Sequence, residues 1–301
     1  MPTVTTRDNV RLHVKSWGDP GGKPVILLHG WPLSADTWDP QAQMLAEAGY
    51  RAISYDRRGF GRSEQPWDGY DYDSLTDDLR DVMRAMEATR DVTLVGFSMG
   101  GGEVVRYMSR HRGEGVTSAA LISSVVPLLI QGPDNPDGVP AATLDEMTAG
   151  MRDDRPAFMR QFLGQFFGQG VLLSSVSDAV MDWAFALTMQ AGLRPTLACA
   201  EAFATTDFRT DLPHLTVPTL VIHGTADAVV PIDATGRTVA RALPDVTFLE
   251  YDGSPHGLFV TEQDRLGADL VNFLASPSAA RVESEPFGDR LSMGSAAPIR
   301  G

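Results

Sequence analysis

The chain has little cysteine, few basic residues and no long apolar runs. One of its 301 residues is a cysteine, Cys199, which excludes an internal disulfide and favours a reducing compartment. Twenty-five lysines and arginines stand against 39 aspartates and glutamates, a formal net charge of −14. So negative a chain repels phosphate backbones and anionic headgroups, which argues against nucleic acid and membrane as partners.

Targeting and ligand signals are also missing. No apolar run approaches the length of a membrane span, and the first residues lack the basic and apolar regions of a signal peptide, so we expect a cytoplasmic protein. No group of His, Cys, Asp and Glu has metal-ligand spacing, and Gly59-Phe60-Gly61 lacks the third glycine of a phosphate loop. We therefore expect neither a metal nor a cofactor.

One stretch carries a strong chemical signal. Alternating β-formers from Val92 run into Gly96-Phe97-Ser98-Met99-Gly100, and a helix-compatible segment follows. A serine becomes a useful nucleophile when a sharp strand-to-helix turn exposes its hydroxyl beside a base, and glycines on both sides relieve the crowding of that turn. The sequence predicts Ser98 as nucleophile, with the amide of Met99 as one donor to the developing oxyanion.

Strand-like and helix-like segments alternate around this stretch. The first two strands predict an antiparallel hairpin, and the alternation that follows predicts an α/β fold with a mostly parallel sheet wrapped by helices. Ser74-x-x-Asp77 has the form of a helix capping box, and apolar residues repeat behind it at helical spacing. The expected strands are 3–6, 10–17, 24–28, 50–55, the start of 92–111, 117–126, 217–222 and 246–251, with helices at 36–48, 233–243 and 258–274 and one that ends at His111.

This alternation breaks after Pro127. A turn-rich linker, 131–140, leads into a segment of helical character rich in Phe, Met and Trp, so we expect a helical cap at 128–211 inserted in a core formed by 1–127 and 212–275. The residues 276–301 are rich in Ser, Ala, Pro, Glu and Gly and predict a disordered tail. Aromatic residues at helical spacing in a cap more often form its own core, but we expect Phe162 and Trp183 to bind substrate.

The serine needs a base, and the chain order of such sites is Ser, then Asp, then His. His256 lies in the loop after the last predicted strand and satisfies that order. The other histidines have simpler explanations at the ends of buried strands (His29, His223), in the first hairpin (His13), after the elbow helix (His111) and in the return from the cap (His214).

A carboxylate must orient that base. Asp227 follows the 217–222 strand, at the carboxyl edge where catalytic groups of open α/β sheets gather. The other nearby carboxylates have simpler explanations: we expect Asp233 to cap a helix and Asp252 to lie in a turn. The second oxyanion donor should come from the loop after the 24–28 strand, so we expect the amide of Trp31, with its indole at the mouth of the pocket.

Several strings together resemble the α/β-hydrolase superfamily, and within it the cofactor-free (non-haem) haloperoxidase, arylesterase and perhydrolase family. The similarity extends from about residue 3 to residue 274, although Thr225-Ala226 stands where many members carry further acids. The strings are 29–33, 55–63, 65–72, 96–103, 189–193 and 255–257.

The resemblance implies hydrolysis of small carboxylic esters through an acyl-serine intermediate, without a cofactor. In some members hydrogen peroxide replaces water, and the peracid formed oxidises halide; others open lactams. Pro32 after Trp31 resembles the members with appreciable perhydrolysis. Substrates would be small esters, lactams or peroxide, and a homo-oligomer is possible.

Four alternatives stay open at this point. A γ-lactamase and a carbon–carbon bond hydrolase share the fold and the nucleophile. A ligand receptor could keep the three residues without turnover, and a true halide-oxidising enzyme would brominate without any carboxylic acid in the buffer.

Overall fold

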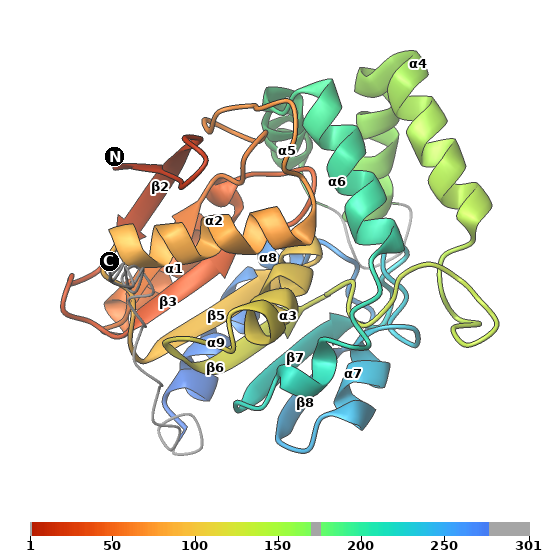
Figure 1. The fold of residues 1–301 in the computed structure, drawn as a ribbon. Coiled ribbons are helices and arrows are strands. Elements are labelled where there is room, and N and C mark those ends of the chain that lie inside the picture. Colours follow the sequence, from red (N-terminus) through yellow and green to blue (C-terminus); the bar gives the residue numbers. More distant parts are fainter. Residues whose placement is uncertain (1, 170–175, 277–301) are drawn as a thin grey trace, which may run out of the picture.

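A single eight-stranded sheet forms the centre of the molecule (Figure 1). The computed structural model describes residues 2–169 and 176–276. The strand order is β1-β2-β4-β3-β5-β6-β7-β8; β1 and β2 are antiparallel, as are β2 and β4, and the other pairs are parallel. The strands are β1 (Thr3–Thr5), β2 (Arg11–Trp17), β3 (Pro24–Leu28), β4 (Arg51–Tyr55), β5 (Val92–Phe97), β6 (Val116–Ile122), β7 (Thr219–Gly224) and β8 (Val246–Tyr251). The hairpin and the α/β class expected from the sequence are confirmed.

Helices cover both faces of the sheet. α2 packs on α3, and α1 packs on α9; Figure 1 shows α2 and α3 in front of the sheet and α9, in blue, behind it. The helices are η1 (Ala35–Trp38), α1 (Asp39–Glu47), α2 (Tyr72–Ala85), α3 (Met99–Arg110), α4 (Ala141–Phe166), α5 (Asp178–Gln190), α6 (Leu193–Thr205), η2 (Leu212–His214), α7 (Gly236–Ala242), α8 (Leu258–Thr261) and α9 (Gln263–Leu274).

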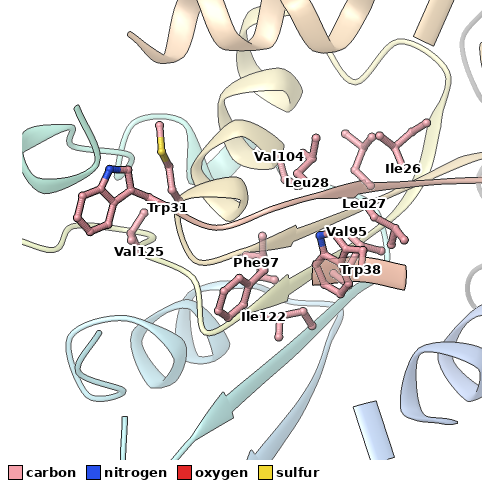
Figure 2. Close-up of a cluster of buried hydrophobic side chains, with 14 of the residues drawn as sticks. Ile26, Leu27, Leu28, Trp31, Trp38, Val95, Phe97, Val104, Ile122 and Val125 are labelled. Carbon is pink, nitrogen blue, oxygen red and sulfur yellow. The ribbon is translucent and has the colours of Figure 1, made fainter. Parts of the chain in front are cut away.

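The core follows from the apolar runs of the central strands. β5 and β6 are buried throughout, as parallel strands covered on both faces must be. Figure 2 shows side chains of neighbouring strands and of the helices over them in one apolar cluster, with Trp31 just beyond the end of β3. The labelled members are Ile26, Leu27, Leu28, Trp31, Trp38, Val95, Phe97, Val104, Ile122 and Val125. This packing fixes the strand ends that carry the site.

Some element bounds differ from the sequence-based expectation. α2 begins before the predicted capping box, because the Asp71 carboxylate accepts from the Ser74 amide at 2.9 Å and is itself the N-cap. β6 ends at Ile122 rather than at 126, since Ser123 has a positive φ of 42° that turns the chain out of the sheet. The expected helix 258–274 is divided at Glu262 into α8 and α9, and the first turn of the helix expected at 36–48 is the 3-10 helix η1.

The long segment between β6 and β7 carries α4, α5 and α6, where the sequence predicts the cap. Figure 1 shows these helices together at one end of the sheet. α4 is kinked at Asp154, two residues before Pro156. The division into core and cap stays a prediction, and the tail expected at 276–301 lies outside the described residues except for Ser276.

Within the described part of the chain, no helix combines the length and the apolar character needed to cross a bilayer.

Candidate active site

Ser98 occupies the tight turn between β5 and α3. Its φ of 53° and ψ of −117° are a strained conformation for a residue with a side chain. Positions 96 and 100 have room only for glycine. A Cβ at Gly96 would lie 2.4 Å from the Gly100 carbonyl oxygen, and a Cβ at Gly100 would lie 2.5 Å from the Leu28 carbonyl oxygen. The Ser98 amide donates to the Ile122 carbonyl at 2.8 Å, which fixes the turn to β6.

Three side chains that are distant in the sequence form one hydrogen-bonded chain. His256 Nε2 lies 3.0 Å from Ser98 Oγ, and its Nδ1 lies 2.7 Å from Asp227 Oδ2. All three residues are buried: Ser98 is 6% exposed, His256 1% and Asp227 8%. The rings of Phe97 and Phe166 pack on the imidazole, with centroids 5.0 and 4.8 Å away. The sequence-predicted Ser98, Asp227 and His256 are therefore brought together at the carboxyl ends of β5, β7 and β8.

The Asp227 carboxylate is held in its charged form. Burial would raise its pKa, but the charge of His256, the nearby His223 N–H group and the hydrogen bond from His256 hold the pKa well below its usual value. Its other oxygen, Oδ1, accepts from the amides of Val229 and Val230 at 2.9 and 2.8 Å. A carboxylate in this state can stabilise a protonated imidazole.

Thr225 joins the loop of Asp227 to the loop of His256. Its Oγ1 accepts from the Gly253 amide at 2.8 Å and donates to Asp252 Oδ1 at 3.2 Å. This is one of the two positions at which the sequence departs from the family's acidic pattern, and here the threonine connects the two loops directly.

The two amides expected to bind an oxyanion belong to Met99, which follows the serine, and to Trp31, which lines the cavity with Ser98. Met99 is the first residue of α3, so its amide has no acceptor within the helix. The Trp31 amide donates to no acceptor among the described residues. The indole of Trp31 donates from Nε1 to the Thr196 carbonyl at 3.0 Å, which fixes this loop to α6.

A buried ion pair supports the loop before Trp31. Arg57 Nε donates to Glu103 Oε1 at 2.8 Å, and its Nη2 donates to the His29 carbonyl at 2.7 Å. Glu103 belongs to the first helical turns of α3, and both charged residues are at most 2% exposed. Burial and then the charge of Arg57 lower the pKa of His29 well below its usual value, so His29 is a neutral histidine that accepts from the Arg57 amide at 3.0 Å. The pair links the loop of Trp31 to the helix of Ser98.

An apolar cavity of about 410 Å³ opens onto Ser98 and His256. Its walls come from the loop after β3, the segment after β6, α4, α6 and the loop after β7. Phe162 lines the cavity and packs edge-on against Trp31, with 5.3 Å between ring centroids. The apolar lining comprises Trp31, Val125, Leu129, Val139, Leu144, Met147, Phe158, Phe162, Phe203, Ala228, Val229 and Val230, with Thr143, Glu146, Gln161 and Gln165 as the other polar members.

The structure corrects the expectation for Trp183. This side chain is 37% exposed and lines a separate surface groove with Lys15 and Phe259. The physical reason is the orientation of α5, which buries Ala184 and Leu187 and leaves Trp183 off that face.

Sequence reasoning also missed residues of the site. Phe203 and the apolar residues after β6 line the cavity, and His223, expected to be structural, lies 3.3 Å from Asp227 Oδ2. No sequence signal pointed to the approach of His223, because it lies in a strand and Asp227 lies in the loop that follows. No group of three His, Cys, Asp or Glu side chains that could hold a metal ion occurs in residues 2–169 and 176–276.

Comparisons with known proteins agree with this architecture. A family model described as alpha/beta hydrolase fold matches residues 23–263. The chain is 42% identical over 280 residues to a non-heme chloroperoxidase from Kitasatospora aureofaciens, covering 91% of this chain and 99% of that protein. It is 37% identical to a bifunctional esterase/perhydrolase from Acinetobacter calcoaceticus, over 92% of this chain and all of the relative (100%). The solved bromoperoxidase from Bacillus anthracis is similar with a TM-score of 0.86 and 39% identity, covering 91% of this chain and 99% of that one.

Proposed function

Because the chain belongs to the alpha/beta hydrolase family, among the non-heme haloperoxidases and esterase/perhydrolases, we propose that it is a cofactor-free serine hydrolase of small carboxylic esters with perhydrolase activity. The observation that carries the proposal is the hydrogen-bonded chain from Ser98 through His256 to Asp227, which opens onto an apolar cavity. An activated hydroxyl at the end of such a cavity is suited to acyl transfer.

The first half of the reaction acylates the serine. His256 Nε2 takes the proton of Ser98 Oγ as that oxygen bonds to the ester carbon, and the amides of Trp31 and Met99 donate to the resulting oxyanion. Asp227 stabilises the imidazolium. When the carbon–oxygen bond to the alcohol breaks, the alcohol leaves with the proton held by His256.

The second half releases the acyl group. His256 takes a proton from water, and the oxygen of water bonds to the acyl carbon while the bond to Ser98 Oγ breaks and the serine regains a proton. If hydrogen peroxide replaces water in the same step, the product is a peracid. The relatives named as haloperoxidases and esterase/perhydrolase support both outcomes for this chain.

The cavity supports neutral, apolar acyl groups as substrates. Its volume of about 410 Å³ suits small to medium ligands. Among its described lining residues, His256 apart, Glu146 is the one ionisable side chain, so a carboxylate on the acyl group meets no cation there. Removing a carboxylate from water without a partner is costly, which disfavours anionic acyl groups.

A substrate panel tests the function. We expect turnover of p-nitrophenyl acetate and butyrate with a burst of nitrophenol, peracid formation when peroxide is added, and loss of both in Ser98→Ala. Ligand capture without a burst would favour a receptor instead. A γ-lactam or a ring-cleavage diketone turned over faster than any ester would replace the ester as substrate class.

The proposed perhydrolase activity is tested by a substitution at Pro32. We expect Pro32→Leu to lower the ratio of perhydrolysis to ester hydrolysis, as the resemblance to perhydrolytic relatives implies. Bromination that persists without any carboxylic acid in the buffer would point to direct halide oxidation. We further propose a cytoplasmic protein with small-molecule partners, since the chain is acidic and has one cysteine.

A further inference from the structure

A second histidine faces the carboxylate that orients His256. His223 lies in β7, four residues before Asp227, and is fully buried. Its Nε2 is 3.3 Å from Asp227 Oδ2 and 2.9 Å from the Val230 carbonyl oxygen. The same Oδ2 lies 2.7 Å from His256 Nδ1, so two imidazoles approach one carboxylate oxygen.

The surroundings of His223 fix which nitrogen carries the proton. Nε2 faces two acceptors, so it must be the N–H nitrogen. Nδ1 has no hydrogen-bond partner among the described residues, and a proton there would be a buried donor without an acceptor. The ring packs on the backbone of Gly236, where a Cβ would lie 2.8 Å from Nδ1. His223 is therefore a neutral Nε2–H donor in a fixed orientation.

With the His223 N–H group nearby, both oxygens of Asp227 face polar hydrogens. A carboxylate has about four lone-pair positions. The amides of Val229 and Val230 fill the two at Oδ1, and His256 fills one at Oδ2. His223 Nε2, which hydrogen-bonds to the Val230 carbonyl, lies 3.3 Å from the same Oδ2.

We propose that His223 is a positioning residue, which acts through Asp227 to set how strongly His256 holds its proton. The proposal rests on the proposed function, in which His256 is the base. The His223 N–H group lies 3.3 Å from Oδ2, and its positive end offsets part of the negative charge of that oxygen. Oδ2 therefore attracts the His256 imidazolium less strongly than it would alone. A base that releases its proton at lower pH is active over a wider pH range.

The other charged groups close to His223 have a weaker influence on the charge of Asp227 Oδ2. Glu250 lies opposite His223 on β8, and its carboxylate pairs with Arg237 of α7 at 2.6 Å. Arg237 also contacts Asp233 at 2.9 Å. The ion pair and the extra carboxylate lie on a more exposed part of the surface, where charges are well screened.

The test follows the titration of the His256 ring protons by NMR, which needs no substrate. In His223→Leu the donor is lost, and we expect the His256 midpoint to move upward by about half to one pH unit. In His223→Gln an amide N–H remains near the position of Nε2, and the midpoint should stay close to that of the unmodified protein. His214→Leu, the same change at an exposed histidine of η2, is the matched control and should have no effect.

The acid limb of kcat/KM against pH should follow the same order, with the Leu variant displaced to higher pH. A midpoint that is unchanged or lower in His223→Leu would overturn the proposal, as would an equal displacement in the Gln variant. An ester turnover of zero with a displaced His256 midpoint would reject the proposed function alone.

If His223→Leu does not fold, the unmodified protein still gives an answer. The Nε2 proton of His223 should change its resonance as His256 titrates, with the same midpoint, because both rings share Oδ2. If the resonance of the His223 Nε2 proton does not change over this titration, His223 does not sense the charge on Oδ2, and the proposal would be wrong.

Discussion

The carboxyl ends of the parallel strands and the helices α4 and α6 meet at one cavity, but they are held by different forces. At the strand ends, both ring nitrogens of His256 and both oxygens of Asp227 have hydrogen-bond partners at 2.7 to 3.0 Å. On the helices, Phe162 is positioned by ring contacts to Trp31 and Phe158, at 5.3 and 6.1 Å between centroids.

Directional bonds and apolar packing respond differently to change. Each donor at the strand ends has one useful position, so a single substitution should abolish a step of the reaction. Apolar contacts are non-directional, and hydrophobic swaps of similar size are tolerated. The comparison predicts that the strand ends determine whether the reaction occurs, and that the helices determine which acyl group enters.

Loss of the nucleophile should have the largest effect. In Ser98→Ala no hydroxyl faces His256, and we expect kcat for p-nitrophenyl butyrate to fall by on the order of 10⁶-fold. Steady-state assays with burst-phase titration measure this, and circular dichroism checks the fold. A decrease of tenfold or less in a folded variant would show that Ser98 is not the nucleophile. It would also show that the strand ends do not determine whether the reaction occurs.

The second prediction compares ion pairs in the two regions. Arg57 and Glu103 are 2% and 0% exposed in their side chains, whereas Arg160 of α4 and Asp182 of α5 are 58% and 70% exposed. Arg57→Met leaves a buried carboxylate without its partner, so we expect a loss of about 3–5 kcal/mol in unfolding free energy. Arg160→Met should change it by less than about 1 kcal/mol.

Urea denaturation of both variants measures the difference. Replacing both members, in Arg57→Met with Glu103→Leu, should recover much of the loss because no charge is left buried. Equal losses for Arg57→Met and Arg160→Met would show that the two regions do not differ in the way described.

The sequence was sufficient where local pattern and fold coincide. The apolar run of β3 and the run of β8 have the bounds expected of them, since strands within a parallel sheet are marked by their own residues. The turn at Ser98 was predictable because the strand, the glycines and the helix that it needs follow one another in the sequence. His256 and Asp227 followed from chain order and strand ends.

The sequence was insufficient where distant contacts decide. Val125 and Val126 continue an apolar run, but Ser123 turns the backbone, and Val125 lines the cavity instead of extending β6. Trp183 resembles a pocket residue in composition, and the rotation of α5 places it elsewhere. His223 looked structural because its approach to Asp227 depends on how the chain bends after β7.

A change in the cavity wall should alter selectivity more than rate. Phe162→Leu keeps an apolar wall but removes volume opposite Trp31, so longer acyl chains gain space. We expect the ratio of kcat/KM for p-nitrophenyl hexanoate over acetate to rise by about tenfold, the scale of one or two methylene contacts. Phe158→Leu, farther along the same wall, is the matched control and should change the ratio less. An unchanged ratio with lowered kcat for every ester would place Phe162 in the catalytic machinery instead.

The smallest effect should come from the charge on the cavity wall. Glu146 is an exposed lining residue of α4, and its carboxylate repels an acyl group that carries a second carboxylate. Because exposed charges interact weakly, Glu146→Gln should raise kcat/KM for p-nitrophenyl hemisuccinate by about two- to fivefold and leave the neutral butyrate unchanged. Added salt should reduce the difference between the two proteins. Asp145→Asn, which removes a charge at the adjacent position outside the lining, controls for the net charge of the chain. If both esters improve equally, the substitution acts through the structure of α4, and the selectivity against anionic acyl groups would have to arise from the apolar wall alone.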